Sequence, residues 1–324
     1  MRLTILLSFL ISFWLVVATQ TPEQRKCETE ISIEDARLVQ EQIASMNSTL
    51  RTDDNARLAP IAIAWHVIYT FPWGVGGGNV PQQRINAGRS PSLCFMATID
   101  LDQAISALNS HFAGTGISFY LQSTSRHWQS AWYSAGPGSQ AASQMKSTLY
   151  VGTRATLNVY SVGMTSSLGY STFPWDYNKA PRQDGVVIKH TTMPGGSETN
   201  YNQGKILTHA VGHWIGLYHV FEGNSCTGIG DIVNDTPMQR TPSYGCPTGK
   251  DSCPNSPGFD SIHNYMDYTY DRSVKLDRGA TAKHLPYSCQ TGFTSGQMVL
   301  ASKDTEASTS FALSRRTLRI VLSI

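Results

Sequence analysis

Three histidines in the segment LTHAVGHWIGLYHVF, residues 207–221, have the spacing of ligands to one metal ion. His209 and His213 are four residues apart, so on a helix their imidazoles project from one face about a turn apart. Gly216 can end the helix in a sharp turn, because a residue without a Cβ atom adopts positive φ, and the turn brings back His219. Three neutral imidazoles leave one tetrahedral position of Zn²⁺ open for water, as in catalytic sites. A single buried histidine is more often a core residue, but this pattern predicts one zinc ion per chain.

The same segment is similar to HExxHxxGxxH, the signature of the metzincin zinc endopeptidases. Together with the later segments FEGNSC, DTP, GKDSC and HNYMDY, it makes residues 60–297 resemble the secreted pappalysin-like (M43) metalloproteases of fungi and bacteria. The resemblance implies a metzincin-like α+β fold, in which a mixed twisted sheet and an active-site helix precede a loop-rich, disulfide-stapled C-terminal subdomain. It also implies a secreted zinc-dependent endopeptidase, a hydrolase that degrades extracellular proteins and peptides.

The resemblance gives further residues a role. It implies that the three histidines hold the zinc ion and that Met266 in NYMDY is the methionine of the turn beneath the metal. Tyr268 matches a tyrosine that can swing toward the metal and stabilise the oxyanion. The segment LGYSTFPW, residues 168–175, matches the edge strand that pairs with an extended substrate, which is a form of β-augmentation.

Ala210 stands where the family has a glutamate, directly after the first histidine. That glutamate takes a proton from the metal-bound water and passes it to the leaving amine, and a methyl group can do neither. Zinc binding needs only the histidines, and alanine is the best helix former, so the site should still assemble. We therefore expect a zinc-loaded protein with little or no peptidase activity. The alternatives are an active endopeptidase and a pseudoprotease that binds peptides or a partner protein.

The N-terminus is typical of a secreted protein. Met1 and Arg2 precede an apolar run over residues 3–17, followed by a small-residue cleavage pattern. We predict that residues 1–18 are a signal peptide and that the protein is extracellular. A membrane anchor is the alternative, but the run is shorter than the roughly 20 apolar residues that span a bilayer.

The region after the signal peptide, residues 19–57, is predicted to be a pro-segment with a helix over 31–48. Its segment RKC, ending at Cys27, resembles the cysteine switch by which some relatives block their zinc, since a thiolate is a strong zinc ligand. Glu28 replaces the glycine that these relatives have next. A disulfide between Cys27 and Cys94 is the alternative.

Six cysteines in a secreted chain indicate disulfides rather than redox or metal chemistry. Four of them lie in the C-terminal third, where periodic apolar sequence is scarce: Cys226, Cys246, Cys253 and Cys289. Four cysteines allow three connectivities, and the sequence by itself leaves all three open. The family resemblance implies Cys226–Cys253 and Cys246–Cys289. Two sequons, at Asn47 and Asn234, predict N-linked glycosylation, although such triplets are common by chance.

Apolar periodicity predicts the elements that position the site. Strands are expected over 61–71, 116–123, 155–162, 168–175 and 184–191. An amphipathic helix is expected over 101–113, and the histidine segment is expected as a helix over 204–216. A last helix, over 293–304, begins at a cap provided by Thr294 or Ser295.

These elements suggest two subdomains, an N-terminal one with the zinc helix over 58–217 and a C-terminal one with the methionine turn over 218–324. The net charge of +2 gives no basic stripe, so neither nucleic acid nor a membrane surface is a favoured partner. The expected partners are protein or peptide substrates. Asp231 and Asp235 are candidate Ca²⁺ ligands, although acidic loop residues are usually only solvated.

Two stretches depart from the family pattern and lack clean periodicity. They are NAGRSPSLCFMATIDL, residues 86–101, and RSVKLDRGATAKHLPYS, residues 272–288. Our hypothesis is that both are translated introns, in which case Cys94 is absent from the natural protein. Finding both stretches in the mature messenger RNA would refute this hypothesis.

Overall fold

The computed structural model describes residues 29, 59–70, 77–80, 100–277, 283–298 and 300–301, with the backbone alone at 273–277 and 283–287. Several expectations lie outside these residues: the signal peptide, nearly all of the pro-segment with its helix, Asn47, Cys27, Cys94 and the stretch 86–99. No helix in the described part is long and apolar enough to cross a membrane.

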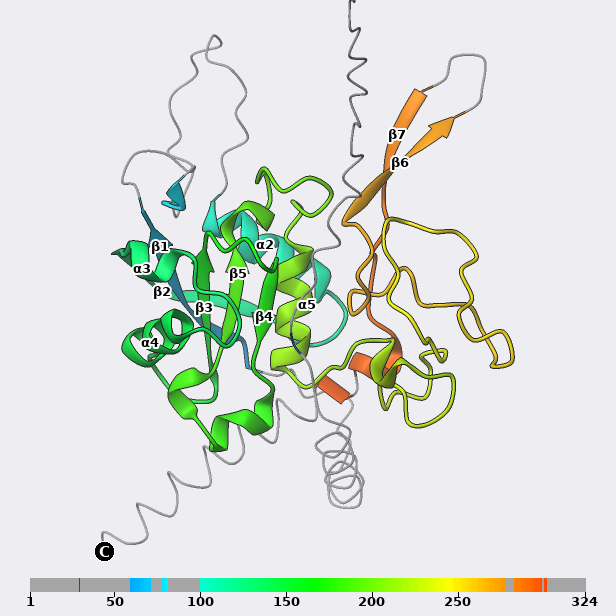
Figure 1. Cartoon of the computed structure of the whole chain (residues 1–324), viewed down its shortest axis with the longest axis horizontal. Coiled ribbons are helices and arrows are strands. Elements are labelled where there is room, and N and C mark those ends of the chain that lie inside the picture. The colour runs from blue at the N-terminus through cyan, green and yellow to red at the C-terminus, as the bar shows by residue number, and fades with distance from the viewer. Residues whose placement is uncertain are drawn as a thin grey trace, which may run out of the picture.

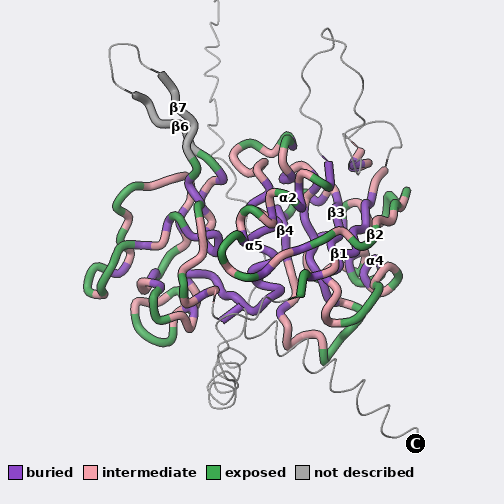
Figure 2. The backbone as a smooth tube through the Cα atoms, turned by 180° about the vertical axis from the view of Figure 1, so that it is seen from behind, coloured by how far each residue is buried: buried purple, intermediate pink, exposed green. Residues whose placement is uncertain are grey.

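A five-stranded mixed sheet forms the centre of the N-terminal half, with the strand order β2-β1-β3-β5-β4. The strands are β1 (Ile61–Tyr69), β2 (Phe119–Trp128), β3 (Thr156–Val162), β4 (Gly169–Ser171) and β5 (Val186–Lys189). The first three and β5 pair in parallel, whereas β4 runs antiparallel to β5 at the edge of the sheet. Figure 2 shows β1 and β3 buried along most of their length, as expected for parallel strands covered on both faces.

Helices cover both faces of this sheet (Figure 1). On one face, α2 (Leu101–His111) and α5 (Lys205–Trp214) share a core with Trp65 and Leu157. On the other face lie α3 (Ser130–Tyr133) and α4 (Gln140–Leu149), which pack around Met145 and Tyr160. Short 3₁₀ helices complete this half: η2 (Pro174–Asn178), η3 (Pro181–Gln183) and η4 (His190–Thr192).

Local sequence explains where α2 begins and which face it buries. The carboxylate of Asp100 accepts a hydrogen bond from the backbone N–H of Gln103 at 2.6 Å, which caps the helix. Its apolar residues recur at helical spacing and are buried: Leu101, Ala104, Ile105 and Leu108. The predicted helix is confirmed, and it ends two residues before the expected boundary at 113.

The C-terminal half consists mainly of loops. It contains η5 (Glu222–Asn224) and the hairpin of β6 (Arg272–Asp277) and β7 (Lys283–Ser288), which projects from the body in Figure 1. Helical residues follow at 295–298 and 300–301. The hydroxyl of Thr294 accepts from the N–H of Gln297 at 3.2 Å, so Thr294 is the cap. The boundary between subdomains at 217/218 stays a prediction.

Candidate metal centre

The zinc-helix prediction corresponds to α5, whose two ends are both set by glycine. Gly204 precedes the helix at φ 82°, and Gly216 follows it at φ 100°, in the left-handed region that favours glycine. The N–H of Leu217 donates to the carbonyl of Gly212 at 2.9 Å, which closes the last turn. The chain therefore reverses directly after the helix and carries His219 back toward it.

The reversal brings three imidazoles together. The Nε2 atom of His213 lies 3.0 Å from Nε2 of His209 and 3.1 Å from Nε2 of His219. All three side chains are buried, and their candidate ligand atoms lie within 4.8 Å of one another. In the described part of the chain, this is the one converging group of three or more potential metal ligands among His, Cys, Asp and Glu.

Backbone carbonyls orient two of the rings. Nδ1 of His209 lies 2.7 Å from the carbonyl oxygen of Tyr265, and Nδ1 of His213 lies 2.7 Å from that of Leu217. A carbonyl only accepts, so each Nδ1 carries the proton and each Nε2 presents a lone pair. Burial lowers the pKa of His209 to about 4 and holds the pKa values of His213 and His219 well below the usual range. The rings are therefore neutral at pH 7, as a metal requires.

This donor set fits a transition metal such as zinc. Three neutral, buried nitrogen ligands suit borderline ions, and a site built from three protein ligands keeps a position for water or substrate. Hydrogen bonds on the outer ring nitrogens are the second shell that such sites need.

Met266 lies directly beneath the ligand helix. Its side chain is fully buried, and a Cβ atom added at Gly212 would lie 2.5 Å from its sulfur. Gly212 is thus small because the methionine packs against the helix backbone between the two helical ligands. The role of Met266 as the methionine of the turn beneath a metal stays a prediction.

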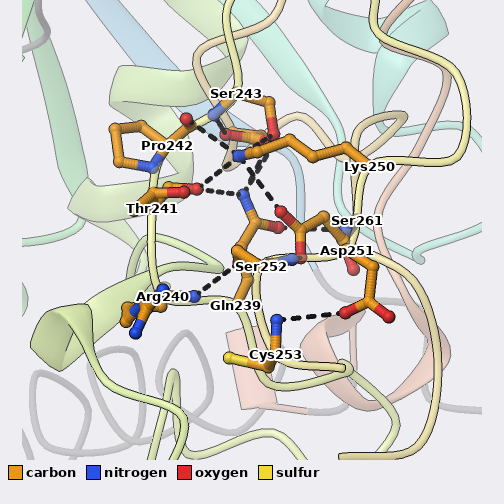
Figure 3. A network of polar contacts seen from close by, with 12 residues as sticks. Gln239, Arg240, Thr241, Pro242, Ser243, Lys250, Asp251, Ser252, Cys253 and Ser261 are labelled. Carbon is orange, nitrogen blue, oxygen red and sulfur yellow. Dashed lines mark hydrogen bonds and ion pairs between the residues drawn. The ribbon is translucent and has the colours of Figure 1, made fainter. Parts of the chain in front are cut away.

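A polar network holds the turn that contains Met266. The carboxylate of Asp267 accepts from the N–H of Ser243 at 2.9 Å and from Nε2 of Gln239 at 3.1 Å. Figure 3 shows Lys250 reaching the same loop, where its ammonium donates to the carbonyls of Thr241 and Pro242 at 2.7 and 3.0 Å. These contacts connect the loop at 239–250 to the turn under the metal centre.

Tyr268 follows this turn and reaches the triad. Its hydroxyl lies 3.2 Å from Nε2 of His219, the atom that faces the other two imidazoles. The ring of Phe221 stacks on His219 with centroids 4.7 Å apart and contacts Tyr268 edge-on. The tyrosine hydroxyl is therefore at the ligand side of the site, where it can donate to a bound oxygen.

Ala210 lies in α5 between the two helical ligands, is fully buried, and offers only a methyl group. That position 210 is the place of the family's acid–base glutamate stays a prediction.

Comparisons with known proteins place this geometry in a family. The family model of peptidase M43, described as pregnancy-associated plasma protein-A, matches residues 143–278, which include the histidines, Met266 and Tyr268. An extracellular metalloprotease of Colletotrichum graminicola is 37% identical over 289 residues, which are 87% of this chain and 91% of that protein. The chain belongs to the peptidase M43 family.

Two further similarities agree with this assignment. Another extracellular metalloprotease of Colletotrichum graminicola is 47% identical over 175 residues, 53% of this chain and 61% of that protein. Among solved structures, a promirolysin mutant of Tannerella forsythia matches with a TM-score of 0.59 and 24% identity, covering 88% of this chain and 95% of that one. The metzincin-like α+β fold expected from the sequence is confirmed, with its mixed sheet and its disulfides in the C-terminal part.

The predicted substrate strand is β4, a sheet edge in this M43 chain. It is shorter than expected, three residues rather than eight, because Pro174 begins η2. The N–H of Ser171 on this edge donates to the hydroxyl of Thr29, which is buried, at 3.0 Å. A residue of the predicted pro-segment therefore contacts the strand at which the family resemblance puts substrate.

A pocket adjoins the triad on the side of Tyr268. Its enclosed space is about that of one water molecule, and its lining includes Leu168, Ile206, His209 and Tyr268. It lies between α5 and the turn after Met266, next to the triad.

The remaining predicted residues lie away from the triad. The disulfides are Cys226–Cys253 and Cys246–Cys289, the two pairs that the resemblance implied. The carboxylate of Asp231 is buried, accepts from the N–H of Val233, and has a pKa raised to about 7 by burial. Asp235 accepts from the N–H of Gly296 at 2.8 Å. Asn234 between them is exposed, whereas Thr236 of the same sequon is buried, and glycosylation at Asn234 stays a prediction.

Sequence reasoning missed two charged residues at this M43 site. Lys205, the first residue of α5, is buried and donates to the carbonyl of Gln290 at 2.7 Å. Glu222, three residues after His219, has a carboxylate oxygen 3.5 Å from Nδ1 of that ligand. The sequence contained a signal for Glu222, an acid one turn after a predicted ligand. Lys205 depends on tertiary contacts that the sequence does not display.

Proposed function

We propose that this chain is a secreted, zinc-binding member of the M43 family that holds peptides in its cleft and cleaves them slowly or not at all. The observation that carries the proposal is the buried triad His209–His213–His219, intact next to Ala210. Metal binding and proton transfer use different atoms, and this chain keeps the first set and lacks the second.

The site supports peptide binding in two ways. The outer edge of β4 can pair with an extended chain once Thr29 leaves the N–H of Ser171, and the Tyr268 hydroxyl can donate to the oxygen of the scissile carbonyl. A zinc ion bound by the triad would polarise that carbonyl and acidify a bound water. What Ala210 cannot do is accept the water proton and return it to the leaving amine.

A second function, binding without cleavage, is favoured by the same residue. If the peptide is held by β4, loss of the acid–base group lengthens the time that it stays intact. Under this reading the physiological partner is a peptide segment or a protein with an extended loop.

Secretion is supported by the apolar run over residues 3–17 and by two disulfides, which form in oxidising compartments. Relatives named extracellular metalloproteases point the same way. We propose residues 1–18 as a signal peptide, 19–57 as a pro-segment, and 58–217 and 218–324 as subdomains that flank the cleft.

Zinc content tests this function. Purified secreted protein should carry about one zinc per chain, and His213→Ala should lose it, because removing one of three ligands opens the site to water. His127→Ala, which removes a half-buried imidazole on β2, is the matched control and should keep the metal. Elemental analysis after dialysis gives the answer. A metal-free wild-type protein at neutral pH would refute the proposal.

A further inference from the structure

The three imidazoles of the triad differ in what holds their outer nitrogen. For His209 and His213 the partner of Nδ1 is a backbone carbonyl, which folding of α5 and the Met266 turn provides. For His219 the group that faces Nδ1 is a side chain, the carboxylate of Glu222, whose Oε2 lies 3.5 Å away, longer than a normal hydrogen bond. A small rotation of either side chain would make this contact a hydrogen bond, so the third ligand can gain its partner from one residue that substitution can remove.

The backbone around Glu222 folds its carboxylate toward that ring. Its own N–H donates to the carbonyl of His219 at 3.0 Å, which forms a tight turn. Gly223 continues the turn at φ 75°, a conformation that favours glycine. The turn therefore sets the direction in which the Glu222 side chain leaves the backbone before any metal binds.

The other sides of the His219 ring are also occupied. Phe221 stacks on one face at an interplanar angle of 11°, and the Tyr268 hydroxyl lies at Nε2. The ring therefore has a defined plane, and what Glu222 adds is the choice of tautomer. A carboxylate only accepts, so it keeps the proton on Nδ1 and the lone pair on Nε2.

We propose that Glu222 is a positioning residue for the metal, a carboxylate that fixes the tautomer of His219 and makes its Nε2 a stronger ligand. The inference rests on the proposed zinc site. Glu222 is not a substitute for the missing acid–base group, since it contacts the Nδ1 side of the ring and the metal position lies on the Nε2 side. It acts through His219, as carboxylates behind histidine ligands do in zinc sites.

The test is the zinc affinity of metal-free protein, measured by competition with a coloured chelator at pH 7.5. Glu222→Ala should bind zinc about 10–100-fold more weakly than wild type. Glu222→Gln should lose less, about three- to tenfold, because its amide oxygen still accepts the proton without the charge that strengthens the bond. Asp102→Ala, which removes an exposed carboxylate from α2, is the matched control and should match wild type.

A second measurement separates positioning from a general effect on folding. In the Co²⁺ form, the exchangeable Nδ1 protons of the three ligands give separate shifted NMR signals, and Glu222→Ala should lose one of them to solvent exchange. Affinity of Glu222→Ala within about threefold of wild type, with all three signals kept, would overturn the inference. Should Glu222→Ala not fold, Glu222→Gln with the zinc affinity of wild type and all three signals would overturn the inference. A wild-type protein that binds no zinc would instead refute the proposed function.

Discussion

At the scale of single residues, Ala210 and the three histidines have separable effects. General acid–base help is worth about 10²–10⁴ in rate, which is roughly 3–5 kcal/mol of barrier. Alanine in place of glutamate at position 210 has little effect on the fold, because alanine is the best helix former and its methyl group is buried in the core that α5 shares with the sheet. Compared with a chain that has glutamate at position 210, this chain should therefore be catalytically weaker but equally stable and equally able to bind the metal.

Met266 gives a stability prediction at this scale. Met266→Ala should destabilise the protein by about 2–5 kcal/mol, because it leaves a cavity against the helix backbone at Gly212. Met266→Leu, which nearly conserves volume, should cost less than about 1.5 kcal/mol. Urea unfolding of the metal-free forms measures both, and equal stability of the two variants would contradict the packing described for this turn.

At the scale of elements, the hairpin β6–β7 is the feature most easily separated from the rest. Its strands pair with each other, and the chain enters and leaves it at adjacent points, since the N–H of Cys289 donates to the carbonyl of Asp271 at 3.3 Å. Lys205, at the start of α5, donates to both Asp271 and Ser288 at the base of the hairpin. The base is therefore tied to the zinc helix.

Shortening this hairpin tests whether it is dispensable. Replacing residues 273–287 with Asn-Gly, a sequence that favours a two-residue turn, should give a folded protein with wild-type zinc content. Lys205→Met is the contrasting variant and should destabilise the protein by roughly 3 kcal/mol, because it leaves buried acceptors without a donor. Loss of zinc from the shortened protein would show that the hairpin supports the site, against the idea that it is a translated intron.

The elements predicted from sequence are those with strong periodicity. The zinc helix is observed over 205–214 against an expected 204–216, because glycines mark both its ends. The helix α4 was not predicted, since it is mostly polar and buries only Ala142, Met145 and Lys146. The hairpin was missed although β6 alternates polar and apolar residues, because each strand has only six residues and Pro286 interrupts β7. The ligands were found because a short motif contains them. Glu222 had a weaker signal, its position one turn after a predicted ligand, whereas the contacts of Lys205 are revealed only by the fold.

At the scale of the whole molecule, the sheet half and the loop half meet at the metal centre. Nδ1 of His209 lies 2.7 Å from the carbonyl oxygen of Tyr265, and the N–H of Gln203 donates to the carboxylate of Asp271 at 2.7 Å. Because the triad takes orientation from both halves, a bound metal stabilises the native state of both.

Buried histidines also make global stability depend on pH. Nε2 of His66 faces the Asn158 oxygen at 3.0 Å, Nδ1 lies 2.7 Å from the hydroxyl of Ser125, and burial lowers the pKa of His66 to about 4. The unfolded chain takes up this proton near pH 6.5 and the folded chain does not, so stability is full above pH 6.5 and is lost as pH falls toward 4. His66 alone should account for about 2 kcal/mol between pH 6.5 and pH 5.

Urea unfolding of the metal-free protein at these two pH values measures the loss. In His66→Gln, which keeps a polar side chain at the position, the free energy of unfolding should fall by about 2 kcal/mol less than in wild type between pH 6.5 and pH 5. A variant with the same pH dependence as wild type would show that His66 is not buried in its neutral form.

Casein digestion by the wild-type protein and by Ala210→Glu, compared at equal zinc content after removal of residues 1–57, tests the central claim most directly. If the chain is a zinc site without its acid–base group, Ala210→Glu should digest at least about a hundredfold faster than wild type. Wild-type digestion within about tenfold of that variant, with Ala210 verified by mass spectrometry, would contradict the account, because another group would then be supplying the base.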